Sequence, residues 1–375
     1  MPKYVFKKKK LKLLIGAVDL LGGIIYAPIR FLRAAKTRNK IPENIVVLRL
    51  DQTGDCVQTL PFFDALRKKY PAARITAVVL ESNGFLFREK PGIDGVITIP
   101  VSWLVKGRKT GLKMVMGLVK SIRSGKFDLG FELRGDIRNI ALLCFSGVKK
   151  IVGYACAGGG FMLDGEIPYD RDMHEIDKNL KLIGIGPVSP PVTMDFPASG
   201  EAAAAEFMEK ASEGKKIKIV IHPFAGAASK MWSPVRYPEL VRRILKAQKD
   251  ALIFITGGPG DAQGWDQFKN NGVINAIGLP VEVSTAIAGK CDIFIGNDSF
   301  MQFVAAYSGL KTCVIAGYTS NYRRWSPKTA PEKLVVFHKP VPCGPCELQV
   351  CNQKSHFCME MITVDEVFNS LIKWL

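Results

Sequence analysis

Short apolar runs alternate with longer stretches of helical spacing through most of the chain. The first series opens with a β-rich run at residues 45–50, passes through a glycine-containing turn into a helical pattern, and repeats this order as far as Tyr154. A second series of the same kind covers residues 217–315. Strands that alternate with helices are typical of a parallel sheet covered by helices on both faces. The pattern therefore predicts two doubly wound α/β domains.

A proline-rich stretch separates the two series. Residues 186–199 contain four prolines and mark a change of composition that suits an interdomain linker. The chain has 375 residues, more than the roughly 250 to 300 at which single hydrophobic cores stop growing. We expect a Rossmann-like domain over residues 41–190, a second over residues 200–340, a cleft between them, and a tail over residues 341–375.

The first 40 residues differ in character from the rest of the chain. They hold eleven Lys or Arg against the single acidic residue Asp19, a net charge of +10, whereas the whole chain carries +18. The other residues therefore carry only +8, so we expect no nucleic-acid partner. A nucleic-acid binder is kept as a third functional interpretation, because the sequence pI is about 9.5.

An apolar stretch of 17 residues, 13–29, lies between two basic groups. It is not a typical secretory signal, because positive charge follows at once and no small-residue cleavage site precedes a neutral start. Interrupted by Asp19 and Pro28, it is marginal for a transmembrane helix. Cations on both flanks suit a helix or hairpin that dips into an anionic membrane surface. We expect residues 1–40 to anchor the protein at such a surface; a transmembrane span and an ordinary packed helix are the alternatives.

Three loops of the second series follow directly after apolar runs, and they contain Lys230, Gly258 and Asn297-Asp298-Ser299. The carboxyl ends of parallel strands share one edge of the sheet, so these loops should converge where open α/β sheets bind ligands. Lys230 can neutralise a diphosphate, and Gly258 permits close backbone approach. Asp298 can accept from a sugar hydroxyl, and Ser299 begins a helix whose free amides attract anions. The simpler alternatives are a helix cap for Asp298 and Ser299, and a solvated surface lysine for Lys230.

The first series ends in a glycine-rich stretch. Residues 153–165 include three consecutive glycines and cannot hold regular structure, which predicts either a mobile loop at the cleft or a plain surface connection.

The tail contains four cysteines with knuckle-like spacing close to His356, namely Cys343, Cys346, Cys351 and Cys358. A structural zinc or iron site, reduced thiols in a compact loop, and a disulfide are the competing interpretations. The other five cysteines are scattered through the chain, as expected of thiols kept reduced in a cytoplasm.

Five segments carry a resemblance to a known family. In chain order they are VVLRLDQTGDCVQTLPFFDALRKKYPAARITAVV, IHPFAGAASKMWSPVRYPELV, FITGGPGD, IAGKCDIFIGNDS and AGYTSNYRRWSP. With these segments the chain resembles glycosyltransferase family 9, the ADP-heptose heptosyltransferases of lipopolysaccharide core synthesis. The resemblance covers most of residues 45–327, but neither the first 40 residues nor residues 100–200. It implies a GT-B fold with an N-terminal acceptor domain and a C-terminal nucleotide-sugar donor domain.

The resemblance also implies a chemistry, which is metal-independent transfer with inversion. Asp55 matches the family's catalytic carboxylate, a general base for the acceptor hydroxyl, and its simpler alternative is a helix cap. Thr53 and Gly54 would belong to the acceptor-side loop. The leaving diphosphate would rely on Lys230 and on the helix that begins at Ser299.

The implied partners are a nucleotide-sugar donor and a lipid-linked oligosaccharide acceptor at the cytoplasmic face of a bacterial inner membrane. No cofactor is expected for catalysis. Residues 361–375 resemble the terminal helix of GT-B enzymes, which crosses back to the first domain.

The chain departs from the family's pattern at the donor side. After Asp-Ser the family usually continues Gly-Pro-Met-His, whereas this chain has Phe300-Met-Gln-Phe303. The usual serine pair of the first loop is replaced by Gln52-Thr53. Besides heptose transfer from ADP-heptose, two readings therefore stay open: a family-9 transferase that uses another nucleotide sugar, and a nucleotide-sugar-binding protein without turnover.

Overall fold

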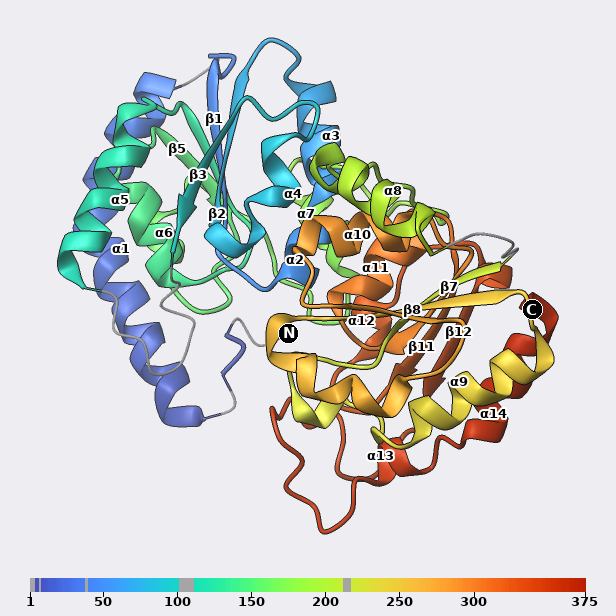
Figure 1. Cartoon of the computed structure of the whole chain (residues 1–375). Coiled ribbons are helices and arrows are strands. Elements are labelled where there is room, and N and C mark those ends of the chain that lie inside the picture. Colours follow the sequence, from blue (N-terminus) through green and yellow to red (C-terminus); the bar gives the residue numbers. More distant parts are fainter. Residues whose placement is uncertain (1–3, 7, 38–39, 101–110, 212–216) are drawn as a thin grey trace. The chain divides into compact units, whose positions relative to one another are not determined.

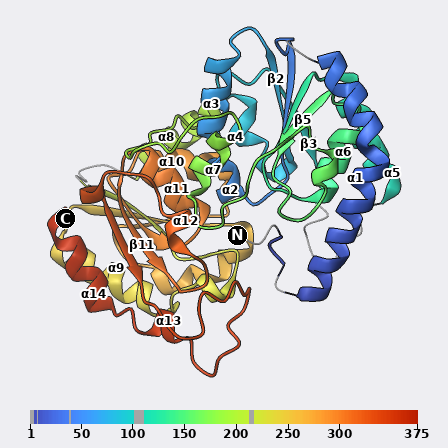
Figure 2. The same ribbon diagram turned by 180° about the vertical axis from the view of Figure 1, so that it is seen from behind.

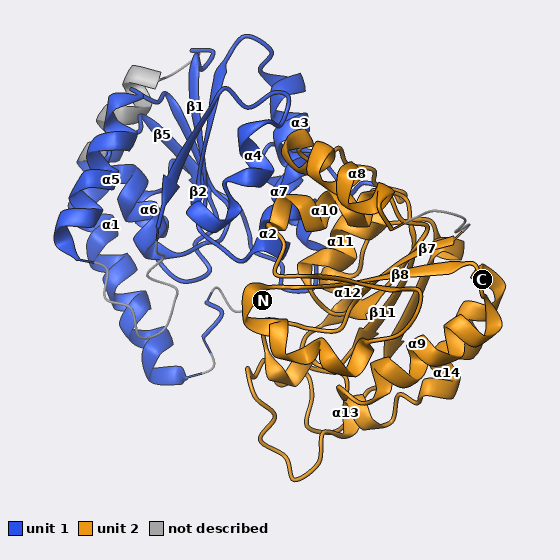
Figure 3. Cartoon of the chain, viewed as in Figure 1, with its two compact units in different colours: residues 1–188 blue, residues 189–375 orange. Residues whose placement is uncertain are grey.

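The computed structural model describes residues 4–6, 8–37, 40–100, 111–211 and 217–375. The chain divides into two compact units, unit 1 over residues 1–188 and unit 2 over residues 189–375 (Figure 3). Each unit is an α/β layer structure built on a six-stranded parallel sheet (Figure 1).

The sheet of unit 1 has the strand order β3-β2-β1-β4-β5-β6. Its strands are β1 (Asn44–Arg49), β2 (Arg74–Leu80), β3 (Gly95–Ile99), β4 (Leu129–Glu132), β5 (Lys150–Gly153) and β6 (Gly165–Glu166). The helices are α1 (Lys9–Thr37), α2 (Thr53–Val57), α3 (Leu60–Lys69), α4 (Phe85–Arg88), α5 (Leu112–Ser124), α6 (Ile137–Phe145) and α7 (Glu175–Lys181), with 3-10 turns η1 (Glu81–Asn83) and η2 (Gly160–Met162). Because β1 is buried on both faces, it reads as a nearly continuous apolar run.

The sheet of unit 2 has the corresponding order, β12-β11-β10-β7-β8-β9. Its strands are β7 (Ile217–His222), β8 (Ala251–Gly257), β9 (Val273–Ile277), β10 (Ile293–Asn297), β11 (Lys311–Ala316) and β12 (Leu334–His338). The helices are α8 (Glu201–Glu209), α9 (Arg236–Ala247), α10 (Val281–Gly289), α11 (Phe300–Tyr307), α12 (Tyr322–Trp325), α13 (Phe357–Glu360) and α14 (Val364–Leu371). The 3-10 turns are η3 (Ala198–Gly200), η4 (Ala228–Lys230), η5 (Pro259–Gly264), η6 (Asp266–Phe268), η7 (Pro331–Lys333) and η8 (Ile372–Trp374).

Two apolar layers hold the second sheet. One packs α9 and α14 against one face, with Trp232 and Trp374 among its buried members, and the other packs α8, α10 and α11 against the opposite face. The helix α14 thus belongs to the core of unit 2. The expected return of residues 361–375 to the first domain is wrong, because Val367 and Leu371 are fully buried in this core.

The N-terminal segment forms one long helix, α1, and not a hairpin. In Figure 2 it runs along the side of unit 1 that carries α5 and α6. Within the described residues, α1 is the one helix long and apolar enough to cross a membrane by length and composition alone. One face of α1 packs on unit 1: Asp19 accepts hydrogen bonds from the hydroxyl of Tyr4 (2.9 Å) and the amide of Gly159 (2.7 Å), and Tyr26 contacts Cys144.

The glycine-rich stretch after β5 is more regular than its composition predicts. It contains η2 and β6, and it forms the surface on which α1 packs. The expectation that residues 153–165 hold no regular structure is therefore wrong. Gly158 and Gly159 have φ of 91° and 87°, and a side chain on Gly158 would meet Ile15 of α1 at 2.7 Å. Glycine at these two positions permits a left-handed turn and a close contact with α1.

Candidate active site

Charged side chains gather in both units at the point where the strand order of the sheet reverses. In unit 1 this point lies between β1 and β4, and in unit 2 between β7 and β10. Ligands of doubly wound sheets bind outside the carboxyl ends of the strands at such points. The loops that follow these four strands carry Asp55, Arg134, Lys230 and Asp298.

In unit 1 the charged groups surround the guanidinium of Arg49, the last residue of β1. Its Nη2 lies 2.9 Å from Glu175 Oε1, 3.3 Å from Asp55 Oδ1 and 3.7 Å from Asp51 Oδ2. Its Nη1 donates to the carbonyl of Leu133 at 3.1 Å. Arg49 is only 1% exposed, so its charge needs these partners.

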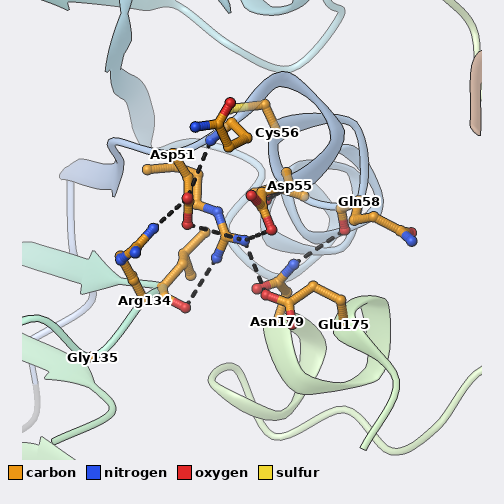
Figure 4. Close-up of polar contacts among 12 residues, drawn as sticks. Asp51, Asp55, Cys56, Gln58, Arg134, Gly135, Glu175 and Asn179 are labelled. Atoms are coloured by element: carbon orange, nitrogen blue, oxygen red, sulfur yellow. Dashed lines mark hydrogen bonds and ion pairs between the residues drawn. The ribbon is translucent and has the colours of Figure 1, made fainter. Parts of the chain in front are cut away.

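Two more cations complete this group. Arg134 forms an ion pair with Asp51, and Lys178 Nζ lies 3.0 Å from Glu175 Oε2. Figure 4 shows Asp51, Asp55, Arg134 and Glu175 pointing toward one another. We call this group the Arg49 cluster: Arg49, Asp51, Asp55, Arg134, Glu175 and Lys178. Its three cations and three carboxylates balance in formal charge.

Asp55 is the third residue of the short helix α2, whose N-cap is Gln52. The helix-cap alternative for Asp55 is therefore wrong. Its side chain is 15% exposed. Burial and the neighbouring negative charge of Asp51 raise the pKa of Asp55 to about 8, against the opposing effect of Arg49. A carboxyl group with a pKa near neutrality can exchange a proton with a substrate.

The other two predicted residues of this loop support its shape. Thr53 donates through its hydroxyl to Asn83 Oδ1 at 2.8 Å, and Asn83 in turn donates to the carbonyl of Asp51 at 2.8 Å. The carbonyl of Gly54 accepts from the amide of Gln58. Thr53 therefore ties α2 to the turn after β2 through side-chain contacts.

In unit 2 the predicted residues Lys230 and Asp298 meet in an ion pair. Lys230 Nζ lies 2.7 Å from Asp298 Oδ2, while Asp298 Oδ1 accepts from Gln302 Nε2 at 2.6 Å. Gln302 Oε1 then accepts from the hydroxyl of Tyr322 at 2.8 Å. We call Lys230, Asp298, Gln302 and Tyr322 the Lys230 chain. Lys230 is a third exposed, whereas Asp298 is buried, so the lysine ammonium is the end of the chain that faces solvent.

Asn297 joins the loops after β7 and β10. Its Oδ1 accepts from the amide of Trp232 at 3.0 Å and from the hydroxyl of Tyr237 at 2.9 Å, and its Nδ2 donates to the carbonyl of Pro223 at 2.7 Å. Asn297 is fully buried. It therefore fixes the loop that carries Lys230 relative to the strand that precedes Asp298.

Ser299 and Gly258 both stand at helix starts. Ser299 is the N-cap of α11, but its hydroxyl makes no capping bond, and its buried Oγ has no hydrogen-bond partner among the described residues. Ser299 thus occupies the N-cap position, but the simpler alternative, that its side chain serves as a helix cap, is wrong. Gly258 follows β8, and its amide donates to Asp261 Oδ2 at 2.8 Å. Its backbone is open, since an added Cβ would meet nothing closer than 3.6 Å.

The four tail cysteines are free thiols, and Cys343 is exposed while Cys358 is buried. In the described part of the chain, no group of three or more His, Cys, Asp or Glu side chains is placed to hold a metal ion. The cysteine side chains in this arrangement do not fit the zinc or iron site that their spacing suggests. The disulfide alternative is not found either.

Several residues of both sites escape sequence reasoning. Arg49 looks like an interruption of an apolar strand, although a charge at a buried strand position signals that a partner must exist. Glu175 and Arg134 lie in stretches without a motif. Tyr322 lies within a segment that resembles the family, and Gln302 lies within the stretch that departs from it, but neither position has a local signal of its partner.

The comparisons with known proteins agree with this architecture. The model of glycosyltransferase family 9 (heptosyltransferase) matches residues 115–356, more than half of the chain. A protein of Haemophilus influenzae that is named as a glycosyltransferase by assignment is 24% identical over 347 residues, covering 86% of this chain and 94% of its own length. The lipopolysaccharide heptosyltransferase 3 of Escherichia coli K12 is 24% identical over 311 residues, covering 76% and 84%.

Solved structures show the same fold. The ADP-heptose lipopolysaccharide heptosyltransferase II of E. coli aligns with a TM-score of 0.70 at 16% identity, covering 88% of this chain and 97% of its own. A family 9 glycosyltransferase of Veillonella parvula reaches 0.73 at 20% identity, covering 88% and 96%. The iron-containing dodecameric glycosyltransferase TibC of enterotoxigenic E. coli reaches 0.54 at 13% identity, covering 89% and 76%.

The fold and the family match thus define a glycosyltransferase of the GT-B type, and this prediction from the sequence is confirmed. The chain belongs to glycosyltransferase family 9.

Proposed function

We propose that the protein transfers a heptose from ADP-heptose to a lipid-anchored lipopolysaccharide core acceptor, with inversion and without a metal ion. The family and the relationship to lipopolysaccharide heptosyltransferase 3 support this class of substrate. The observation that carries the proposal is Asp55, a carboxyl group with a raised pKa at the switch point of unit 1.

In this reaction Asp55 acts as the general base. Its carboxylate takes the proton of the acceptor hydroxyl while the hydroxyl oxygen forms a bond to the anomeric carbon of the sugar. The bond between that carbon and the diphosphate oxygen breaks, and ADP leaves from the opposite face of the ring. Arg49, whose Nη2 also contacts Glu175, keeps the Asp55 carboxylate oriented for this proton transfer.

The donor's diphosphate fits the exposed end of the Lys230 chain. The ammonium of Lys230 supplies positive charge, and the amides that begin α11 add partial positive charge. Three buried polar atoms without partners among the described residues, Ser299 Oγ, Thr319 Oγ1 and His338 Nε2, occur on segments at this same edge of the sheet. Unpaired buried polar atoms are costly, so they support a polar ligand here. Because Lys230 and the amides that begin α11 can compensate the charge of the leaving diphosphate, we propose transfer without a metal ion.

Phe300 is the residue most relevant to donor choice. It replaces the small residue expected after Asp-Ser, and its ring lies 6.4 Å from that of His222. Burial lowers the pKa of His222 to about 4, so at neutral pH this side chain offers an uncharged ring. The larger apolar side chain of Phe300 leaves two alternatives for the function open. They are transfer from a related nucleotide sugar, and nucleotide-sugar binding without turnover.

A donor screen with a paired substitution tests the proposal. Nucleotide release from ADP-heptose, UDP-sugars and GDP-sugars is measured with the purified full chain and a lipid-linked core acceptor. We expect release from ADP-heptose, and a loss of 100-fold or more in kcat for Asp55→Asn, since a general base contributes about 10²–10⁴.

Glu43→Gln is the matched control, because this exposed carboxylate precedes the opposite end of β1. We expect its kcat to stay within about twofold of wild type, the size of a surface substitution. No release from any ADP-sugar contradicts the donor assignment, and transfer by Asp55→Asn within about tenfold of wild type contradicts the base assignment.

We further propose that α1 holds the enzyme on a membrane surface. Its outward face exposes a row of apolar side chains: Leu13, Leu14, Leu20, Leu21, Ile24, Ile25 and Phe31. Its inward face is bonded to unit 1 through Asp19, so a bilayer span would break those contacts. An amphipathic helix with flanking lysines and arginines suits the interface of an anionic leaflet. This position would confine the enzyme to the surface that carries its acceptor.

Flotation with anionic vesicles checks the membrane proposal. We expect the full chain to float, and the double substitution Leu20→Ser with Leu21→Ser to remain largely in solution. Leu112→Ser, an exposed leucine on α5, is the control and should float like wild type. If the doubly substituted protein still floats with the vesicles at high salt, docking through this face is contradicted.

A further inference from the structure

The turn that carries Lys230 is held from outside by the cysteine-rich loop, which we define as residues 342–358. All three contacts are made by Ser229, the residue before Lys230. Its amide donates to the carbonyl of Gln349 at 3.1 Å, and its hydroxyl donates to the carbonyl of Leu348. Its carbonyl accepts a hydrogen bond from His356 Nε2 at 3.0 Å. Ser229 is 1% exposed, so these bonds are shielded from water.

The turn has little stability of its own. Within η4, Lys230 is held by the bond from its amide to the carbonyl of Ala227, a single turn of 3-10 geometry. Such turns have poorer hydrogen-bond geometry than an α-helix and depend on their surroundings. A lysine side chain also loses considerable entropy when it is fixed. Besides the ion pair with Asp298 and the bonds of Asn297 to the same loop, the position of the Lys230 ammonium therefore depends on what holds Ser229.

The end of β11 shows how closely the loop is fitted to this turn. A Cβ added to Gly317 would lie 3.3 Å from the carbonyl oxygen of Ser229 and 3.4 Å from Cys358 Sγ. Glu347 donates through its amide to the carbonyl of Thr319 at 2.7 Å. The loop thus contacts both the Lys230 turn and the segment after β11.

We propose that His356 is a positioning residue for donor binding: through the Ser229 carbonyl it fixes the turn that presents Lys230 to the donor's diphosphate. The cysteine-rich loop then supports the donor site through this turn. Because the Ser229 carbonyl can only accept, His356 Nε2 must carry the hydrogen. The inference rests on the proposed role of Lys230 in diphosphate binding.

A local effect is expected because the chain after the loop is anchored separately. Trp232 Nε1 and Arg236 Nη1 both donate to the carbonyl of Ile362, at 2.9 Å and 2.6 Å. These bonds remain when His356 is replaced. Loss of the imidazole should loosen η4 and leave the packing of α9 and α14 intact.

Steady-state kinetics with varied donor test the inference. His356→Ala should raise the donor KM about fivefold to tenfold, the size of one lost hydrogen bond, while kcat stays within about twofold. His356→Gln should restore most of the affinity, because its amide nitrogen can donate from a similar reach. Gln353→Ala, an exposed substitution on the same loop, is the matched control and should leave KM unchanged.

Two further measurements distinguish a role of His356 in positioning Lys230 from a general structural role. In a Lys230→Ala background, His356→Ala should add less than about twofold to the donor KM, since the group that it positions is gone. Hydrogen exchange of the Ser229 amide should accelerate in His356→Ala but not in Gln353→Ala. An additive effect in the double variant, or a wild-type KM in His356→Ala, overturns the proposal.

The exchange measurement also distinguishes this inference from the proposed function. If wild type releases nucleotide from no nucleotide sugar, the proposed function fails. Unchanged protection of the Ser229 amide in His356→Ala overturns the claim that His356 holds the η4 turn, whatever the substrate.

Discussion

The Arg49 cluster of unit 1 and the Lys230 chain of unit 2 occupy equivalent positions in two sheets of the same strand order. They differ in the number of charged side chains and in how these are paired. The Arg49 cluster concentrates six ionisable side chains in one place, and the buried guanidinium of Arg49 is one of them. The Lys230 chain has a single ion pair, which continues inward through the neutral side chains of Gln302 and Tyr322.

The difference matches the two halves of the proposed reaction. A base needs a carboxylate whose pKa is raised toward neutrality, and crowding Asp51 beside Asp55 in a buried place does this. Diphosphate binding needs a cation held in one place, and neutral hydrogen bonds behind Asp298 can hold it without adding negative charge. The two clusters should therefore respond differently to substitution.

Arg49→Met should change the protein most, by lowering its stability. Removing the guanidinium leaves Asp51, Asp55 and Glu175 without their common partner, and breaking a buried ion pair costs about 3–5 kcal/mol. Urea unfolding followed by circular dichroism measures the loss. Lys149→Met, which removes a surface pair with Asp128, should cost less than about 1 kcal/mol. Equal costs for the two variants would contradict the central role of Arg49.

The next effect is a shift in pH dependence, from Asp51→Asn. Asp55 acts as a base only when ionised, so kcat/KM should rise with pH through its pKa of about 8. Asp51 raises this pKa through its negative charge, and the amide removes that charge. The rising limb of kcat/KM should therefore move to lower pH. A limb that stays in place or moves to higher pH would show that Asp51 does not tune the base.

The smallest effect is expected from Tyr322→Phe. The substitution removes the hydroxyl that donates to Gln302 Oε1, and one neutral hydrogen bond contributes about 1 kcal/mol. Donor KM should rise roughly fivefold, with kcat within about twofold, because the change reaches Lys230 only through Gln302 and Asp298. Tyr70→Phe in unit 1 is the control. A change in kcat larger than the change in KM would contradict a role confined to donor binding.

Much of this picture could be predicted from the sequence. Apolar runs followed by helical periods predict the strand–helix order, because burial on both faces of a parallel sheet leaves that pattern in the chain. The same order places Asp55, Lys230 and Asp298 after strands, and hence at the carboxyl edge of a sheet. Loop residues with chemical groups at that edge are recognisable from local sequence alone.

The partners of these residues could not be predicted in this way. Arg49 and Glu175 are 126 positions apart, and Ser229 and His356 are 127 positions apart. No local period relates such pairs, and their contacts exist only after the sheets and their covering helices have packed. The prediction for the glycine stretch at Gly158–Gly160 was wrong for the same reason. Its turn packs against the helix α1, which is distant along the chain.

The two α/β series, the basic apolar N-terminal segment and the loops that carry Asp55, Lys230 and Asp298 can be recognised in the sequence alone. These features follow from short-range rules of burial and periodicity. Three contacts become visible only in the folded protein: Arg49 joins three carboxylates, Asp298 holds Lys230, and the cysteine-rich loop bonds to Ser229. Buried polar groups must find partners wherever the fold brings them, and the distance along the chain does not enter that requirement.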